Sequence, residues 1–159
     1  MTADRINAWG FSHFCDDIRS EVGGKISIMG IYQSEMIFPS SLEFPFAVPK
    51  FCVLVKYYEK LGVFSDDLSL RVFLPGDIPE KPSIVNPLAR ADFAKVDPSA
   101  PLEADQERIL NLTFPVVMAP LTFRQSGFVK VRIVCGDLTT NLGSIFVRKQ
   151  RADEAISFA

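Results

Sequence analysis

The sequence predicts an all-β fold, an antiparallel β-sandwich of about seven to eight strands with little helix, and three observations predict it. Apolar residues alternate with polar ones in short runs along most of the chain. Glycine and proline separate these runs, and no amphipathic helix of ten or more residues comes between them. A small closed β-barrel is the alternative that the same pattern allows.

The expected strands form two groups. Those of the first group are 5–15, 25–32, 51–58 and 68–74, and those of the second group are 108–118, 127–135 and 140–148. Gly23 and Gly24 are expected to turn the chain between the first two strands with positive φ. The Gly136-Asp137 step predicts a tight hairpin turn between the last two.

A long proline-rich loop is predicted over residues 75–106. It contains six of the eleven prolines, and its apolar residues keep no sustained period. One short edge strand is expected within it, at 83–86. Long loops in compact domains usually carry function, so this segment is the first candidate for a binding edge, and an ordered connection without function is the equal alternative.

Composition indicates one globular domain over residues 1–159, with strand-rich parts at 5–74 and 108–148 and a tail at 149–159. The chain is 48% hydrophobic and 23% charged, with a formal net charge of -2. Since there is no excess of positive charge, general nucleic-acid binding is disfavoured. The sequence shows neither a secretory leader nor an apolar run long enough to span a membrane, which predicts a cytoplasmic protein without membrane association.

The three cysteines, Cys15, Cys52 and Cys135, each lie in a strand-like apolar run. An odd number cannot all pair within one chain, so free buried thiols are expected. Together with His13 they could form a zinc site, but the closely spaced cysteine pairs typical of such sites are absent. The sequence therefore predicts no metal and no cofactor.

No catalytic residue is predicted either, because the chain has a single histidine and none of the common nucleotide-binding or hydrolase motifs. Aspartates at strand ends could gather into a calcium pocket, but Asp is also common at turns, where it accepts backbone hydrogen bonds. These aspartates are Asp16, Asp17, Asp66, Asp67 and Asp137.

A positively charged cluster is also possible on the last predicted hairpin. Lys130, Arg132 and Arg148 could share one exposed face. Such charges either protect a sheet edge from pairing with another chain or contact nucleic acid.

One stretch resembles a known family. Residues 16–32 read DDIRSEVGGKISIMGIY and contain the pattern G-G-K-x-S-x-x-G-x-Y from Gly23 to Tyr32. Followed by a proline-flanked segment and leucine-rich β runs, this stretch resembles an uncharacterised bacterial domain-of-unknown-function family, number six-nine-four-one. The resemblance is best over the N-terminal hairpin and extends further only as a matching order of strands. It implies a β-sandwich-like fold and a bacterial origin, and it implies no catalytic residue.

The function expected from the sequence is protein interaction or self-association without catalysis. Phenylalanine occurs 14 times, often in predicted loops, and such side chains mark a partner surface when they are exposed together. The alternative is a small-molecule-binding or metal-dependent enzyme with its site near His13, Asp16 and Asp17. The residues expected to bind a protein partner or a second copy are Phe44, Phe46, Ile78, Pro79 and Phe93.

Overall fold

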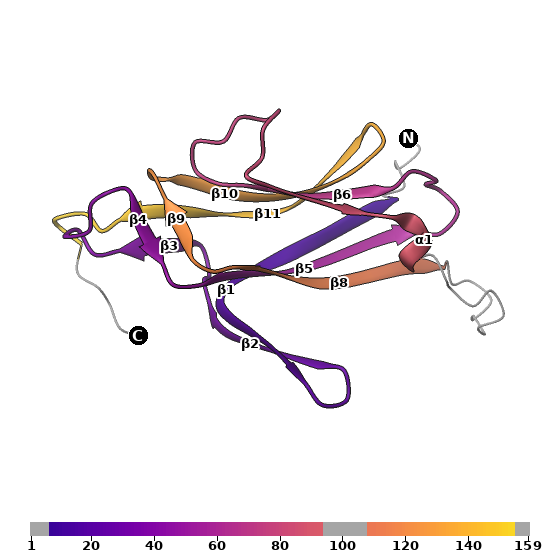
Figure 1. Cartoon of the computed structure of the whole chain (residues 1–159), viewed down its shortest axis with the longest axis horizontal. Helices are drawn as coiled ribbons and strands as arrows, with labels where there is room; N and C mark the ends of the chain where they lie inside the picture. The colour runs from indigo at the N-terminus through magenta and orange to yellow at the C-terminus, as the bar shows by residue number, and fades with distance from the viewer. Residues whose placement is uncertain (1–6, 94–107, 155–159) are drawn as a thin grey trace, which may run out of the picture.

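The computed structural model describes residues 7–93 and 108–154, and it confirms the all-β prediction (Figure 1). The described elements, in chain order, are β1 (Ala8–Glu21), β2 (Lys25–Ile31), β3 (Glu35–Phe38), β4 (Phe46–Val48), β5 (Phe51–Lys60), β6 (Leu68–Phe73), β7 (Ile84–Leu88), α1 (Arg90–Phe93), β8 (Ile109–Met118), β9 (Leu121–Phe123), β10 (Gly127–Cys135) and β11 (Leu138–Lys149).

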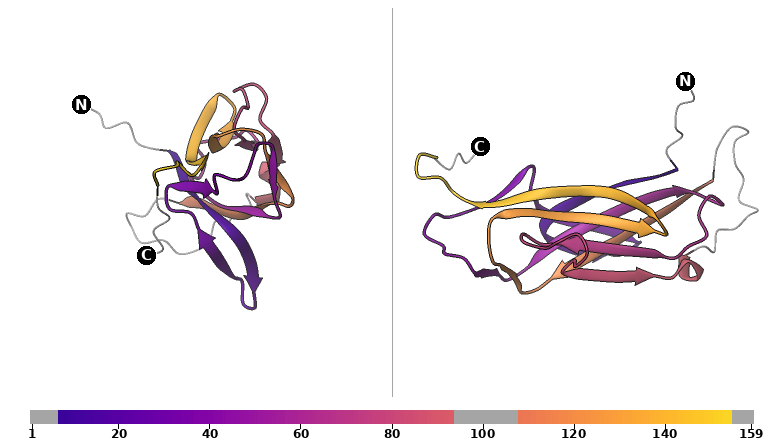
Figure 2. Two further views of the ribbon diagram at one scale, coloured as in Figure 1. Left: turned by 90° about the vertical axis from the view of Figure 1, so that its left-hand side faces the viewer. Right: turned by 90° about the horizontal axis from the view of Figure 1, so that it is seen from above.

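Two sheets pack face to face to form a sandwich, and neither of them closes into a barrel (Figure 2). One sheet has the strand order β2-β1-β5-β8, and the other has the order β3-β11-β10-β6-β7. Among the described strands, every pairing is antiparallel except that of β3 with β11. A third, two-stranded sheet of β4 and β9 lies at one end of the sandwich (Figure 1).

The core between the two sheets explains the alternation in the sequence. Along β10, Val129, Val131 and Ile133 are fully buried, while the residues between them lie on the outer face. Strand β5 is buried on both faces from Phe51 to Val55, which accounts for the continuous apolar run at its start. Burial of each such side chain stabilises the fold by about 1.5–3 kcal/mol relative to exposure.

Strand β1 is longer than the predicted strand 5–15. It continues to Glu21, because residues 15–21 pair with β2 from Cys15 opposite Ile31 to Glu21 opposite Lys25. The expected turn follows, with φ of 83° at Gly23 and 73° at Gly24. The prediction that β1 ends at the acidic pair 16–17 is therefore wrong.

Three short strands, β3, β4 and β9, raise the number of described strands to eleven, above the seven to eight expected. They have only three or four residues each, which is too short for a period to show in the sequence. The eight longer expected strands are all present.

The described part of the proline-rich segment is not one long loop. It contains β7, which overlaps the expected edge strand 83–86 at residues 84–86, and the four-residue helix α1. Pro87 is tolerated in β7 because this strand forms the edge of its sheet. The rest of the predicted loop, 94–106, lies outside the described residues. Over residues 7–93 and 108–154 no helix is long and apolar enough to cross a membrane.

Candidate functional site

Strands β1 and β2 continue past the sandwich as a two-stranded arm, residues 16–30. β5 pairs with β1 only from Ala8 to Cys15, so residues 16–21 pair with β2 alone. Figure 1 and the left view of Figure 2 show this hairpin projecting away from the two sheets. The arm therefore stands outside the two packed sheets.

One face of the arm is apolar. The register places Ile18 opposite Ile28 and Ser20 opposite Ile26, so the three isoleucines share this face. Ile26 is 39% exposed, and Val22 at the tip is 97% exposed. None of these side chains is among those that pack against the core.

The other face of the arm carries charges that alternate in sign, together with Met29, which lies opposite Asp17 and is 43% exposed. Arg19 donates a hydrogen bond of 2.8 Å from Nε to Asp17, and Ser27 donates one to Glu21. Lys50, just before β5, forms an ion pair with Asp17 and so ties the base of the arm to the sandwich. The hydrogen bonds from Lys50 and Arg19 lower the pKa of Asp17 to about 2.

A second contact fixes the base of the arm. The hydroxyl of Tyr32 donates a hydrogen bond to Asp16. Gly30 faces Asp16 with φ of 67°, and a Cβ at this position would lie 2.1 Å from Asp16 Oδ2. The glycines, serine and tyrosine of the pattern G-G-K-x-S-x-x-G-x-Y thus have structural roles in the turn and the base of the arm.

The predicted partner-binding residues do not form one surface. Phe44 and Phe46 are partly buried and stack with ring centroids 5.0 Å apart. Phe46 also packs against Phe38 and Phe123, at 4.4 and 6.0 Å. These rings cover one end of the core instead of forming an exposed patch.

The other three predicted residues lie elsewhere. Phe93 belongs to α1, which is at the opposite end of the sandwich from β4 (Figure 1), and its ring packs against the core and beneath Arg90. Ile78 is 57% exposed, and Pro79 follows it in the loop between β6 and β7. The structure therefore brings together Phe44 with Phe46 and Ile78 with Pro79, but it does not bring all five residues to one surface.

The three residues of the alternative site near the N-terminal hairpin, His13, Asp16 and Asp17, do not face one another. His13 lies on the outer face of β1 against Phe11, with ring centroids 5.3 Å apart. Asp16 and Asp17 point to opposite faces of the arm and are held by different partners. In the described ranges no group of three or more His, Cys, Asp or Glu side chains is placed to hold a metal ion.

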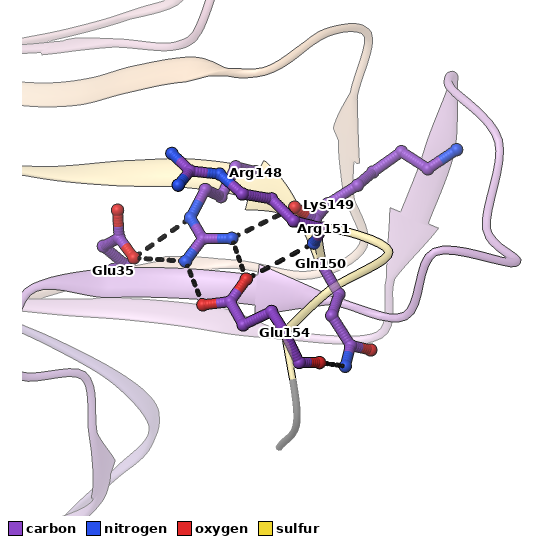
Figure 3. Close-up of polar contacts among 6 residues, drawn as sticks. All are labelled: Glu35, Arg148, Lys149, Gln150, Arg151 and Glu154. Atoms are coloured by element: carbon purple, nitrogen blue, oxygen red, sulfur yellow. Dashed lines mark hydrogen bonds and ion pairs between the residues drawn. The ribbon is translucent and has the colours of Figure 1, made fainter. Parts of the chain in front are cut away.

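The positively charged cluster expected on the last hairpin forms only in part. Arg148 is buried between two carboxylates: it donates to Glu35 at 2.8 and 3.0 Å and to Glu154 with two bonds of 2.7 Å (Figure 3). Arg148 follows Val147, the residue of β11 that pairs with Gly127 at the start of β10, so Arg148 has no β10 residue opposite it. At this position β3 and the turn after β11 enclose it. Lys130 and Arg132 lie on the outer face of β10, where they line a cavity together with Arg71, which sequence reasoning did not single out.

Comparison with known proteins gives no match: no family model, no curated protein and no solved structure matches this chain. The resemblance of residues 16–32 to a bacterial family therefore stays a prediction.

Proposed function

We propose that this protein works by association with a second copy of itself through the arm. The observation that supports this function is that Ile18, Ile26 and Ile28 share one face of the arm, where β1 and β2 pair only with each other among the described strands. Contiguous apolar side chains that a monomer leaves uncovered are typical of association surfaces.

Burial of the isoleucine face of the arm lowers the free energy of the protein. An isolated two-stranded hairpin is only marginally stable in water. Full burial of an isoleucine side chain contributes about 1.5–3 kcal/mol, of which the monomer obtains only a part on this face, because Ile18 and Ile28 are half-buried and Ile26 is exposed. Packing of the arm against a partner therefore stabilises both the arm and the complex.

The edge of β2 favours a second copy as the partner. β2 is the outer strand of its sheet, so its outward backbone N–H and C=O groups pair with no described strand. It contains no proline, and its single charged residue, Lys25, lies at the turn. Two β2 edges that pair antiparallel about a two-fold axis would join the sheets of both copies and place their isoleucines on one continuous face.

The charges of the arm are compatible with this arrangement. On the polar face, Asp17 and Glu21 are matched by Arg19 and Lys25. A second arm that comes alongside this face therefore meets two positive and two negative charges, while Asp16, at the base of the isoleucine face, adds one negative charge that Tyr32 holds by a hydrogen bond.

The test is the mass of the protein in solution, measured by sedimentation over a range of concentrations. The wild-type chain is expected to form a dimer, and the substitution Ile28→Lys is expected to give a monomer with unchanged circular dichroism. Val85→Lys is the matched control, because Val85 is 54% exposed on the edge strand β7 of the other sheet, and it should leave the dimer intact.

Three results would overturn the proposal. One is a wild-type chain that is a monomer at every concentration. Another is an Ile28→Lys chain that dimerises as the wild type does. A monomeric chain whose arm binds a different protein would also overturn self-association and assign the arm to another partner.

A further inference from the structure

A cavity of about 370 Å³ lies on the outer face of the five-stranded sheet, which is not the sheet that carries the arm. β6, β10 and β11 form its floor, and the loop that follows β6 stands beside it (Figure 1). Its volume falls within the range of small-molecule sites. The lining residues are Arg71, Phe73, Leu74, Pro75, Gly76, Asp77, Pro79, Phe128, Lys130, Arg132, Val134 and Thr139.

Three positive charges meet on this floor. Arg71 on β6 lies directly opposite Arg132 on β10 in the register, and Lys130 is two residues before Arg132 on the same face. Like charges directly opposite one another destabilise a sheet. Within the described residues none of these three side chains forms an ion pair with a carboxylate.

The two arginines are also partly removed from water without a negative partner. The Nε atom of Arg71 is buried and has no hydrogen-bond partner among the described residues. Arg132 donates only to backbone carbonyls, at 2.8 Å to Val131 and 3.4 Å to Gly143, and burial lowers the pKa of its guanidinium. A buried donor without an acceptor costs about 1–3 kcal/mol, so this arrangement calls for a physical explanation.

The one acidic residue of the lining, Asp77, does not neutralise these charges. Its Oδ2 atom accepts hydrogen bonds from the backbone N–H groups of Leu74 and Ser83, at 2.8 and 2.7 Å, and its Oδ1 atom accepts one from the Ser83 hydroxyl at 3.0 Å. Asp77 therefore holds the shape of the loop. The lining keeps three positive charges against this single negative one.

Apolar side chains complete the cavity. Phe73 precedes the loop, and Phe128 lies at the start of β10. Leu74 and Pro75 add further apolar surface from the loop. The cavity thus combines a positively charged floor with apolar walls.

We infer that this cavity binds a small organic anion, in which a carboxylate or phosphate group is attached to an apolar body. The terminal guanidinium nitrogens of Arg71 and Arg132 donate hydrogen bonds to the anion, because Nε of Arg71 is buried away from the cavity. The negative charge relieves the repulsion between the two arginines, and Lys130 adds a third positive charge. Phe73 and Phe128 contact the apolar body. This site is independent of the proposed dimer, because it lies on the other sheet.

The experiment uses phenyl phosphate and phenylacetate as probes, with benzyl alcohol as the neutral analogue, and measures binding by calorimetry. At least one of the two anions is expected to bind, and the stronger of them identifies the preferred group, while the alcohol should not bind. Arg71→Gln and Arg132→Gln should each weaken anion binding at least about tenfold. Lys56→Gln, which removes a positive charge from the other sheet, is the matched control and should bind as the wild type does.

Two further measurements keep the test independent of folding. Without a ligand, Arg71→Gln should be at least as stable to urea as the wild type, because it removes one of two facing positive charges. Val134→Phe should block the cavity while it keeps all three positive charges, and it should abolish binding. The inference is overturned if neither anion binds, if Arg71→Gln binds as Lys56→Gln does, or if an oligonucleotide binds there and the small anions do not.

Discussion

Glu59, at the end of β5, is 1% exposed, and its carboxylate forms an ion pair with Arg90 of α1. Tyr57 donates a further hydrogen bond of 2.9 Å to the same carboxylate. Arg90 also donates at 2.8 Å from Nε to the carbonyl of Asp66 and from its backbone N–H to the carboxylate of Asp67. This pair therefore fastens the proline-rich segment to the end of both sheets.

Removal of Arg90 should destabilise the fold strongly. Arg90→Met leaves the Glu59 carboxylate buried without its positive partner, which costs about 3–5 kcal/mol. Urea unfolding measures this loss. Glu59→Gln combined with Arg90→Met removes the unpaired charge, so the double variant should be more stable than Arg90→Met alone. A double variant that is less stable would contradict the role given to the pair.

The contact of Arg148 with Glu154 predicts a pH dependence. Hydrogen bonds from Arg148 and from the backbone of Arg151 lower the pKa of Glu154 from 4.5 to about 2. Because folding favours the ionised form, the stability that this contact contributes is complete above pH 4.5 and is lost as the pH falls through about 2. The urea midpoints of the wild type and Glu154→Gln should therefore differ at neutral pH and converge in acid.

The matched control for this pH dependence is Glu43→Gln. Glu43 accepts a hydrogen bond of 2.9 Å from Lys149, but its side chain is 83% exposed. Its substitution should leave the urea midpoint unchanged at every pH. A constant difference between Glu154→Gln and the wild type down to the lowest pH would contradict the prediction.

The inner face of β1 offers a pair of matched substitutions. A Cβ on Gly10 would lie 2.2 Å from the carbonyl oxygen of Lys56, so Gly10→Ala should cost about 1–3 kcal/mol through overpacking. Two residues further, the buried Ser12 hydroxyl has no hydrogen-bond partner among the described residues. Ser12→Ala should therefore be neutral or stabilising. Thermal unfolding of both variants measures the contrast, and equal stability of the two would show that β1 packs differently.

The thiols of Cys15 and Cys52 should not react in the folded protein. Both side chains are fully buried, and desolvation raises the pKa of Cys15 to about 11. Mass spectrometry after iodoacetamide treatment at neutral pH should show neither residue modified, whereas the same treatment in denaturant should modify all three cysteines. Rapid modification of either residue in the native protein would contradict this burial.

The fold could be predicted largely from local patterns, because burial leaves a period in the sequence wherever a strand crosses the core. The exposed arm does not cross the core, so residues 16–21 form a strand although apolar and polar residues do not alternate there. The parallel pairing of Glu35 with Phe146 joins residues far apart in the chain, and no local pattern contains that information.

The candidate sites were less predictable for a related reason. Composition shows that phenylalanine is abundant, but it does not show that Phe44 and Phe46 pack against other rings at the end of the core. Lys130 and Arg132 were visible as charges on one strand. Their meeting with Arg71 depends on which strand lies beside β10, which the sequence of β10 does not contain.

The contact between β1 and β11 has a consequence for biosynthesis. A Cβ on Gly10 would approach Leu142 to 2.7 Å, so the first and last strands of the sandwich pack directly against each other. A ribosome makes β1 before β11, with nine of the described strands between them. The inner face of β1 therefore cannot pack against β11 until β11 has left the exit tunnel, and until then its apolar side chains stay open to contacts with other chains.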